Sequence, residues 1–552
     1  MPTIERKTTQ QTETYLYRPV AKAPDAVPLA WVYPAPYNIA LSSLGYLSLF
    51  RQMDENPAIH PVRIYTDTLS SHSPREFVLA GMSFSFEMDI LGILDIFAAW
   101  QLPPYSKDRD ENHPLLFAGG PVAMTNPEPC AEFFDFFVIG DGEEVLAEIV
   151  ACYRRYRELD RTSLLRKLAV EVSGVYVPSL YEIDYETPDG PVKSITPKFA
   201  DTPPVVQKRT TQTLDDFTIY SPILSNDTVF ENRFLVEVMR GCAHRCRFCL
   251  ASYSVLPARG PGLDPLIARI EEGLKYTNKL GLLGALVSNH PQFPELCDYL
   301  NTKEGVHVSS SSLRADTLTL SIAQMFKKGG QNQITIAVET GSDRLKRRIN
   351  KNLKNEEVIR AAGFAAEAGL KGLKLYGMVG LPDEAEDDVV QLAQLMKDIK
   401  KAHPRLKLSL TVSSFVPKAA TPFQWQPRLD NKTIEARQQL LKKALLKTAD
   451  VRPTSPGWDF VQAVLSRGDR RLAPLLLRYH QLGGSKGALN RAYKELKGEG
   501  LALPALDHYA NAVRPEAETL PWDALHLGVD KAILYKEGLP PSGWLDICKG
   551  SG

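Results

Sequence analysis

Arg240-Gly241-Cys242-Ala243-His244-Arg245-Cys246-Arg247-Phe248-Cys249 holds three of the chain's seven cysteines, in the spacing Cys-x3-Cys-x2-Cys. An apolar run at 234–239 precedes it and predicts a buried strand. Three thiolates on one loop are typical of a metal or iron–sulfur site, because thiolates are soft ligands. A four-iron cluster held by three cysteines leaves one iron open, and chemistry occurs at open positions. The segment therefore predicts a metal or iron–sulfur site on Cys242, Cys246 and Cys249, with a [4Fe-4S] cluster as the form that would leave one iron open.

This spacing, with Phe248 directly before the last cysteine, resembles the cluster motif of radical S-adenosylmethionine (SAM) enzymes. The resemblance implies that SAM chelates the fourth iron and is cleaved by one electron to a 5′-deoxyadenosyl radical. It also implies an electron donor such as flavodoxin or ferredoxin. Phe248 is expected to shield the cluster, with ordinary packing as the alternative. A zinc site would need a fourth ligand, which His244 supplies only by pointing into its own tight loop.

The composition sets limits on location and partners. The chain has 552 residues, with 65 lysines and arginines against 65 aspartates and glutamates. A net charge of zero gives no indication of a nucleic acid partner. Residues 1–23 lack the apolar segment of a signal peptide, and no apolar run reaches 18 residues. We expect a cytoplasmic protein that does not bind membranes. The remaining cysteines at 130, 152 and 297 are expected to be buried structural thiols.

After a polar arm at 1–26, short apolar runs alternate with helical stretches over 27–165. This order predicts a parallel sheet with helices on both faces, which binds ligands beyond its strand C-termini. The predicted strands are 27–33, 62–66, 77–84, 115–118 and 133–139. The predicted helices are 39–53, 90–100 and one that ends near 156. The fold class is therefore α/β, beginning with a Rossmann-like domain.

Several strand ends of this region resemble the N-terminal cobalamin-binding-type domain of one branch of the radical SAM family. The matching stretches are Ser83-Phe84-Ser85, Ala118-Gly119-Gly120-Pro121 and Ile139-Gly140-Asp141-Gly142-Glu143-Glu144. The resemblance implies cofactor contacts at Ser83, Gly119, Gly120 and Gly140. Many such domains ligate cobalt through the histidine of an Asp-x-His-x-x-Gly motif, but residues 34–40 contain no histidine. Either cobalt lacks a lower protein ligand, or the domain holds no cobalamin and its glycines only form turns.

A connector at 166–230 is predicted to contain a hairpin of strands 174–183 and 192–199. The domain at 231–425 is predicted to have strands at 234–239, 285–287, 306–310, 333–338, 373–378 and 408–415. One helix between these strands is expected to begin at Asp264-Pro265. Two others, at 355–368 and 387–399, are each expected to bury one face, the second through Val390, Leu395 and Ile399. Six strand–helix units resemble the partial (β/α)6 barrel of the radical SAM family, with its site at the strand C-termini. Residues 426–552 are predicted to be mostly helical.

Polar residues and glycines follow the predicted barrel strands. Ser311 and Arg314 follow the third strand, and the planar guanidinium of Arg314 suits a carboxylate of SAM or substrate; a surface ion pair is the alternative. Glu339, after the fourth strand, resembles the family glutamate that contacts SAM. Gly377 and Gly380, at the fifth strand, resemble the stretch that packs on adenine; a bare turn is the alternative.

Nearly the whole chain from residue 27 resembles a little-characterised three-part subgroup of radical SAM proteins. The first hypothesis is a radical SAM enzyme, with cobalamin-dependent methyl transfer as its elaboration. The second is a cobalamin-independent radical enzyme that abstracts hydrogen, rearranges its substrate or inserts sulfur, with RNA among its candidate substrates. The third is a non-catalytic metal-stabilised binding protein. The sequence does not identify the substrate.

Overall fold

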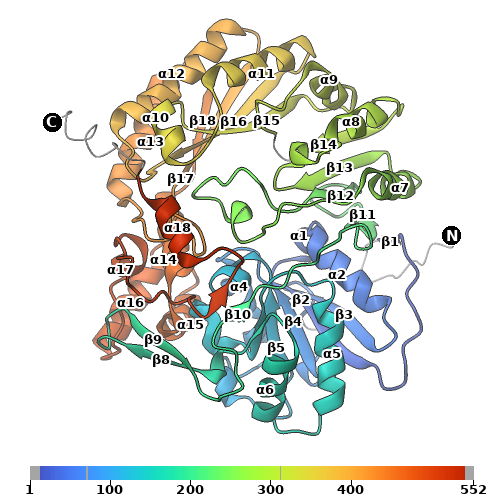
Figure 1. Ribbon diagram of the computed structural model, residues 1–552, viewed down its shortest axis with the longest axis vertical. Coiled ribbons are helices and arrows are strands. Elements are labelled where there is room, and N and C mark those ends of the chain that lie inside the picture. The colour runs from blue at the N-terminus through green and yellow to red at the C-terminus, as the bar shows by residue number, and fades with distance from the viewer. Residues whose placement is uncertain (1–12, 70–71, 311–312, 541–552) are drawn as a thin grey trace. The chain divides into compact units, whose positions relative to one another are not determined.

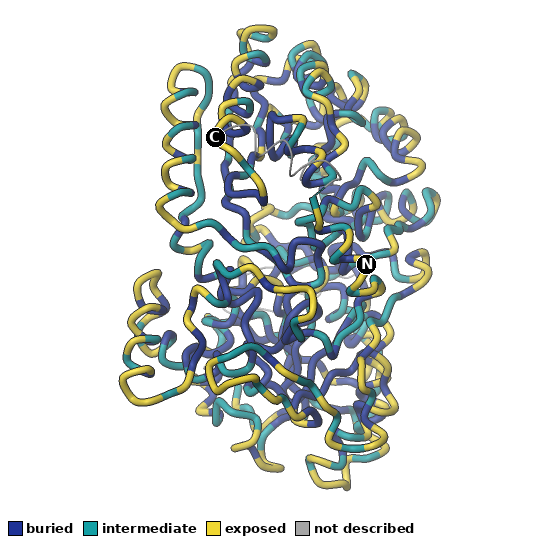
Figure 2. The backbone as a smooth tube through the Cα atoms, turned by 60° about the vertical axis from the view of Figure 1, so that its left-hand side comes forward, coloured by how far each residue is buried: buried dark blue, intermediate teal, exposed yellow. Residues whose placement is uncertain are grey.

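The computed structural model describes residues 13–69, 72–310 and 313–540. The chain divides into two compact units, and each unit includes part of the C-terminal region. Unit 1 comprises Met1–Phe234, Val464–Tyr509 and Ala517–Gly528, and unit 2 comprises Leu235–Ala463, Ala510–Glu516 and Val529–Gly552. Figure 1 labels the elements, and Figure 2 shows that buried positions concentrate along the strands.

Unit 1 is built on a six-stranded sheet in the order β3-β2-β4-β5-β6-β7. Its strands are β2 Val27–Tyr33, β3 Ile59–Tyr65, β4 Leu79–Ser83, β5 Leu115–Gly119, β6 Phe136–Val138 and β7 Val175–Tyr176. All neighbours pair in parallel except β6 and β7. The helices are α1 Tyr37–Ala40, α2 Leu44–Asp54, α3 Asp89–Ala99, α4 Pro121–Thr125, α5 Val145–Tyr156 and α6 Arg161–Glu171. The predicted α/β class and its mainly parallel sheet are confirmed.

Three small strand pairs complete unit 1. They are β1 Glu13–Tyr15 with β11 Ile223–Ser225, β8 Tyr181–Tyr185 with β9 Val192–Pro197, and β10 Val206–Gln207 with β19 Leu525–His526. The predicted hairpin is wrong in its first strand, because a 3-10 turn at Pro178–Leu180 interrupts it. The part before this turn becomes β7 and joins the main sheet, and only the part after it pairs with β9.

Other predicted boundaries in unit 1 are also wrong. The expected helix 39–53 is two helices, because the extended backbone of Ser43 separates α1 from α2. The expected strand 133–139 is shortened to β6, because Glu128–Phe133 forms a 3-10 helix. Neither break changes the sheet order, so the strand ends that were expected to bind a ligand still share one edge.

Unit 2 contains a three-stranded sheet, β12-β13-β14, and a four-stranded parallel sheet, β15-β16-β17-β18. Its strands are β12 Phe234–Met239, β13 Lys279–Gly284, β14 His307–Ser310, β15 Gln333–Glu339, β16 Gly372–Val379, β17 Lys407–Ser414 and β18 Asp450–Pro453. A parallel bridge from Leu313 to Ile336 links the two sheets. The helices are α7 Leu263–Leu274, α8 Phe293–Asn301, α9 Leu320–Lys328, α10 Asp343–Arg348, α11 Asn355–Glu367, α12 Glu386–Ala402 and α13 Asn431–Leu445. Helices cover the outer side of the strands, as in an open barrel (Figure 1).

Two strands of unit 2 differ from the prediction. The predicted strand 285–287 is wrong, because β13 ends at Gly284. Leu280 and Leu282 of β13 are buried, but glycine is unusual inside a strand, so the two glycines of β13 weaken the strand pattern in the sequence. The short edge strand β18 was not predicted, because none of its residues is fully buried.

Two helices also depart from the prediction. The start of α7 is Leu263, with Gly262 as N-cap instead of Asp264. The apolar face of α11 is as predicted, but Val390 of α12 is 45% exposed and Val389 is buried instead.

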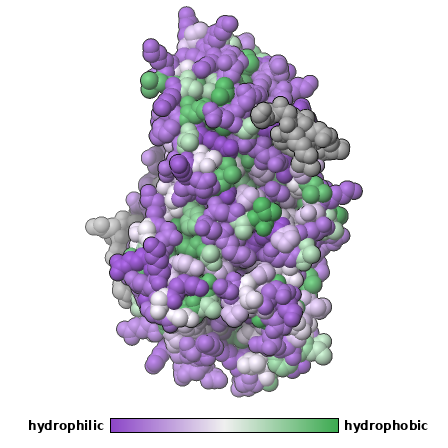
Figure 3. Space-filling view, turned by 90° about the vertical axis from the view of Figure 1, so that its left-hand side faces the viewer, coloured by the Kyte–Doolittle hydropathy of each residue, from purple (hydrophilic) through white to green (hydrophobic). Residues whose placement is uncertain are grey.

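The C-terminal region is mostly helical, as predicted. Its helices are α14 Pro456–Arg467, α15 Ala473–Gln481, α16 Ala488–Gly498, α17 Leu506–Ala510 and α18 Lys531–Gly538. Within residues 13–69, 72–310 and 313–540, no helix combines the length and apolar character needed to cross a membrane. On the face shown in Figure 3, hydrophilic side chains predominate and hydrophobic ones form small separate groups.

Candidate active site

The cysteine loop follows β12 directly and turns at Gly241. This residue has a φ of +73°, and a Cβ atom there would lie 2.6 Å from the carbonyl oxygen of Val255, so only glycine fits without strain. Cys242 and Cys246 are buried, and Cys249 is half-buried. The amide of Cys249 donates to the carbonyl of Cys246 at 2.9 Å, which closes a tight turn between the last two cysteines.

The donor set of this loop fits a cluster held by three thiolates. All three cysteines are free thiols. Burial, together with the charges of Cys249 and Cys242 and against that of Lys351, raises the pKa of Cys246 to about 12, so the three thiols lie within electrostatic reach of one another. In the part of the chain that the structure describes, no three His, Cys, Asp or Glu side chains are already arranged around a metal position.

The turn after α10 holds the cysteine loop from one side. The side-chain amide of Asn350 donates to the carbonyl of Arg245 at 2.9 Å and of His244 at 3.3 Å. The amide of Arg247 donates to the carbonyl of Ile349 at 3.0 Å, and its guanidinium donates to the carbonyl of Arg348 at 2.6 Å. Four bonds thus fix the backbone between the first and last cysteine.

A C-terminal helix, α18, holds the same loop from another side within unit 2. Tyr253, which is 1% exposed, donates its hydroxyl to Glu537 of α18 at 2.7 Å, and this hydroxyl also lies 3.0 Å from the carbonyl oxygen of Arg245. The guanidinium of Arg245 pairs with Glu537 at 2.9 Å. No local pattern indicates this contact, because 284 residues separate Tyr253 from Glu537.

The zinc alternative finds no support at His244. Its Nε2 atom lies 3.0 Å from the side-chain oxygen of Asn289, and burial lowers its pKa. The imidazole is thus engaged by a residue after β13, away from the thiols it would have to join as a fourth ligand.

Phe248 packs, partly buried, against an apolar cluster. The cluster consists of Leu345, Ile349, Leu381, Phe415 and Phe423, with Met378 also packed against it. Both expectations for Phe248 are compatible with this position, because a ring packed beside Cys249 also limits the access of water to it.

Arg314 is buried and already paired. Its guanidinium donates to Asp316 at 2.7 and 2.9 Å and also bonds to the carbonyl of Asn352. This arrangement is the ion-pair alternative in a buried form, and contact of Arg314 with SAM or substrate stays a prediction. Ser311, the other residue predicted after β14, lies outside the described residues.

Glu339 ends β15 in a conformation that non-glycine residues rarely adopt. Its φ is +62°, and the pairing of β15 with β16 shifts register beside it. Its carboxylate lies 3.1 Å from the ammonium of Lys351, a residue that the sequence reasoning missed. Backbone strain of this kind clusters at functional sites, which agrees with the predicted role of Glu339.

Gly377 has a packing reason to be glycine, and Gly380 has a conformational one. A Cβ atom at Gly377 would lie 2.9 Å from a methyl carbon of Leu392 on α12. Gly380 has a φ of +79°, and its amide donates to Glu384 at 2.7 Å. The adenine contact at these positions stays a prediction.

Two family models match this chain. The model of the radical SAM superfamily matches residues 236–396, which include the cysteine loop and β15, and the model of the N-terminal region of radical SAM proteins matches residues 51–178. The chain belongs to the radical SAM superfamily. The protein is therefore an enzyme, and membership of this family implies a [4Fe-4S] cluster and SAM.

Relatives of this radical SAM protein include two archaeal proteins. One is "Uncharacterized protein MJ0966" of Methanocaldococcus jannaschii, 31% identical over 81% of this chain and 90% of that protein. Another is "Uncharacterized methyltransferase PH0819" of Pyrococcus horikoshii, 24% identical over 57% of this chain and 65% of that protein. Among solved structures, the cobalamin-dependent SAM radical enzyme OxsB with aqua-cobalamin bound aligns with a TM-score of 0.48 at 12% identity, over 96% of this chain and 81% of that chain.

The predicted cobalamin residues of unit 1 lie at the carboxyl edge of its sheet. Ser83 and Gly119 end the paired strands β4 and β5. Gly120 has a φ of +116°, and the carbonyl oxygen of Phe84 lies 2.7 Å from where its Cβ atom would stand. At Gly140 that position lies only 2.0 Å from the carbonyl oxygen of Arg209. The chain itself therefore fills the space beside Gly120 and Gly140.

Residues 34–40 do not provide a cobalt ligand either. They form the turn before α1 and α1 itself, and the hydroxyl of buried Tyr37 donates to Glu13 at 2.8 Å. Backbone contacts thus explain the glycines at 120 and 140 without a cofactor, and the cobalamin contacts at Ser83, Gly119, Gly120 and Gly140 stay predictions.

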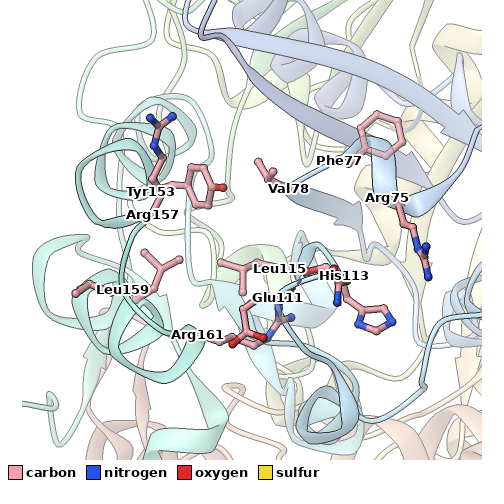
Figure 4. Close-up of a pocket in the computed structure, with 12 residues that line it drawn as sticks. Arg75, Phe77, Val78, Glu111, His113, Leu115, Tyr153, Arg157, Leu159 and Arg161 are labelled. Carbon is pink, nitrogen blue, oxygen red and sulfur yellow. Dashed lines mark hydrogen bonds between the residues drawn. The ribbon is translucent and has the colours of Figure 1, made fainter.

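A cavity of 330 Å³ lies at the opposite, amino edge of this sheet (Figure 4). Val78 precedes β4 and Leu115 begins β5, and Tyr153 of α5 projects toward the same space. Because parallel sheets bind ligands at their carboxyl edge, this cavity is not the predicted cofactor site. The three other cysteines of the described chain, Cys130, Cys152 and Cys297, are buried as expected.

Proposed function

We propose that this radical SAM enzyme cleaves SAM at a [4Fe-4S] cluster held by Cys242, Cys246 and Cys249, and transfers a methyl group to its substrate. The observation that carries the proposal is the cysteine loop: three free thiols on one turn, fixed by backbone hydrogen bonds at the end of β12. The methyltransferase name of the Pyrococcus horikoshii relative supports the class of reaction.

When bound, such a cluster supplies the electron that breaks the sulfonium bond of SAM. The chain's own residues bind and orient the substrate. The carboxylate of Glu339 would accept hydrogen bonds from the amino group or the ribose hydroxyls of SAM, since it lies at a strand end near Cys246. Phe248 and its apolar neighbours would keep water from the half-buried Cys249. A flavodoxin or ferredoxin would serve as the one-electron donor.

Cobalamin dependence is the more specific form of this proposal, and cobalamin-independent radical chemistry is the second candidate. The second is favoured by the contacts of Gly120 and Gly140 and by the lack of histidine in 34–40. Anaerobic reconstitution with hydroxocobalamin, followed by gel filtration, separates the two. A corrinoid retained at one per chain supports the first candidate, and none retained supports the second.

The test of the shared proposal is an assay on anaerobically purified, iron-reconstituted protein with dithionite and SAM. We expect iron–sulfur absorption and the formation of 5′-deoxyadenosine or, with methyl-labelled SAM, transfer of label to a substrate from cell extract. A colourless protein that binds neither iron nor SAM would favour the third hypothesis, a non-catalytic binding protein.

A further inference from the structure

The ion pair of Lys351 and Glu339 is a buried charge arrangement with no assigned role. Lys351 Nζ lies 3.1 Å from Glu339 Oε1, and the two side chains are only 8% and 10% exposed. Lysine is almost never fully buried unless it is paired, because removing its charge from water is costly. Burial alone would lower the pKa of Lys351, but the Glu339 carboxylate and the Cys246 thiol hold it above its ordinary value. The ammonium is therefore charged at neutral pH.

The position of Lys351 is tied to that of the cysteine loop. Its amide donates to the carbonyl of Lys346 at 2.8 Å, which ends α10 in a fixed turn. The preceding residue, Asn350, bonds to the loop backbone at Arg245. The same turn thus holds the cysteine loop and places the buried ammonium of Lys351 beside Glu339.

A second buried lysine, on α10 itself, provides a comparison. Lys346 is 3% exposed, but its ammonium faces Asp343 at 3.8 Å and bonds to Asn355. Lys346 and Lys351 are therefore both buried lysines near the end of α10. They differ in the groups that lie beside their ammonium groups.

Three thiolates and a cluster bring negative charge into this region. A fixed cation in surroundings of low dielectric interacts strongly with such charge. The reduction potential of an iron–sulfur cluster depends on net charge and hydrogen bonding around it. A nearby ammonium raises the potential, because it stabilises the state that has gained an electron.

We propose that Lys351 is a positioning residue that holds the carboxylate of Glu339 at the strand end and offsets the negative charge of the cysteine-held cluster, so that a one-electron donor reduces the cluster more readily. This inference rests on the proposed function. It gives the ion pair two effects: one on SAM binding through Glu339, and one on the potential through the charge of Lys351.

The test is a dithionite redox titration of the reconstituted protein, followed by electron paramagnetic resonance, together with calorimetry of SAM binding. Lys351→Gln should make the potential more negative and weaken SAM binding about tenfold. Lys351→Arg should restore the potential, because it keeps the charge. Glu339→Gln should shift the potential in the opposite direction, because it removes a negative charge; this variant also serves if Lys351→Gln does not fold. Lys346→Gln is the matched control and should leave the potential unchanged.

Equal potentials in the parent and in Lys351→Gln, or equal shifts in Lys351→Gln and Lys346→Gln, would overturn the inference. Shifts of the same sign in Lys351→Gln and Glu339→Gln would overturn it too. In each case a parent protein that forms its cluster and cleaves SAM leaves the proposed function standing. A parent protein that binds no cluster would overturn both.

Discussion

The side-chain amide of Asn350 donates to the carbonyl of Arg245 at 2.9 Å, and both residues have left-handed backbone, with φ of +55° and +52°. Asn350 lies beyond α10, and Arg245 lies between the first two cysteines of the loop. Non-glycine residues rarely form left-handed turns. A hydrogen bond between two such turns indicates that each turn stabilises the conformation of the other. The shape of the cysteine loop therefore depends on a residue about 100 positions away.

Asn350→Ala should lower the free energy of unfolding by about 1 to 3 kcal/mol, because it removes two hydrogen bonds to part-buried carbonyl groups, those of His244 and Arg245. Iron content after reconstitution should fall as well, and both are measured on the same preparation. Asn350→Gly keeps the left-handed turn without strain. If it loses as much iron as Asn350→Ala, the effect is due to the side-chain hydrogen bond. Asn278→Ala, which removes a bond to Gly305 in another loop, is the control and should keep its iron.

The three cysteines should act as one ligand set. Cys242→Ala, Cys246→Ala and Cys249→Ala are each expected to lose most of the bound iron and all SAM cleavage, because a cluster on two thiolates is not retained. Cys297→Ala, at a buried thiol of α8, is the matched control. Parent levels of iron and 5′-deoxyadenosine in any loop variant would disprove the assignment of that cysteine.

Gly140→Ala should destabilise unit 1 by about 2 to 4 kcal/mol, because the new Cβ atom would collide with the backbone of Arg209 in a left-handed conformation. Gly119→Ala is the control: its nearest contact would be an ordinary 3.7 Å to Val138. Thermal unfolding of both variants measures the difference. Equal melting temperatures would show that the connector at Arg209 does not cover Gly140.

Stability should depend on pH through Glu384. Burial raises its pKa to about 7 from its ordinary value of 4.5, while Arg437 and the amide of Gly380 act in the opposite direction. Between these pH values the folded state binds more protons than the unfolded chain, so the free energy of unfolding falls as pH rises from 4.5 to 7. Glu384→Gln should remove a fall on the order of 2 kcal/mol, measured by denaturant unfolding across this range. If the pH profile of Glu384→Gln is identical to that of the parent, or to that of the exposed-site variant Glu386→Gln, this role of Glu384 is contradicted.

Local patterns in the sequence predicted the parts of the fold that local physics decides. Continuous apolar runs such as 234–239 gave strands with the right bounds, because both faces of these strands are buried. The cysteine spacing located the candidate site. By contrast, β13 was misplaced because the residues packed beside its glycines are distant in sequence.

The unpredicted parts of the site depend on long-range contacts. Lys351 follows no motif, and only the folded turn after α10 brings its ammonium to Glu339. Glu537 is likewise near the cysteine loop only through the placement of α18. The reasons for glycine at Gly120 and Gly140 also came from the fold, since at each position a backbone carbonyl oxygen lies where a Cβ atom would stand.

The account depends most directly on an iron site that is open to SAM. The measurement is electron paramagnetic resonance of the dithionite-reduced, reconstituted protein before and after SAM is added. We predict a [4Fe-4S] signal whose g values change with SAM, and the absence of this signal in Cys246→Ala. A parent signal that SAM leaves unchanged, or no cluster signal at all, would contradict the account.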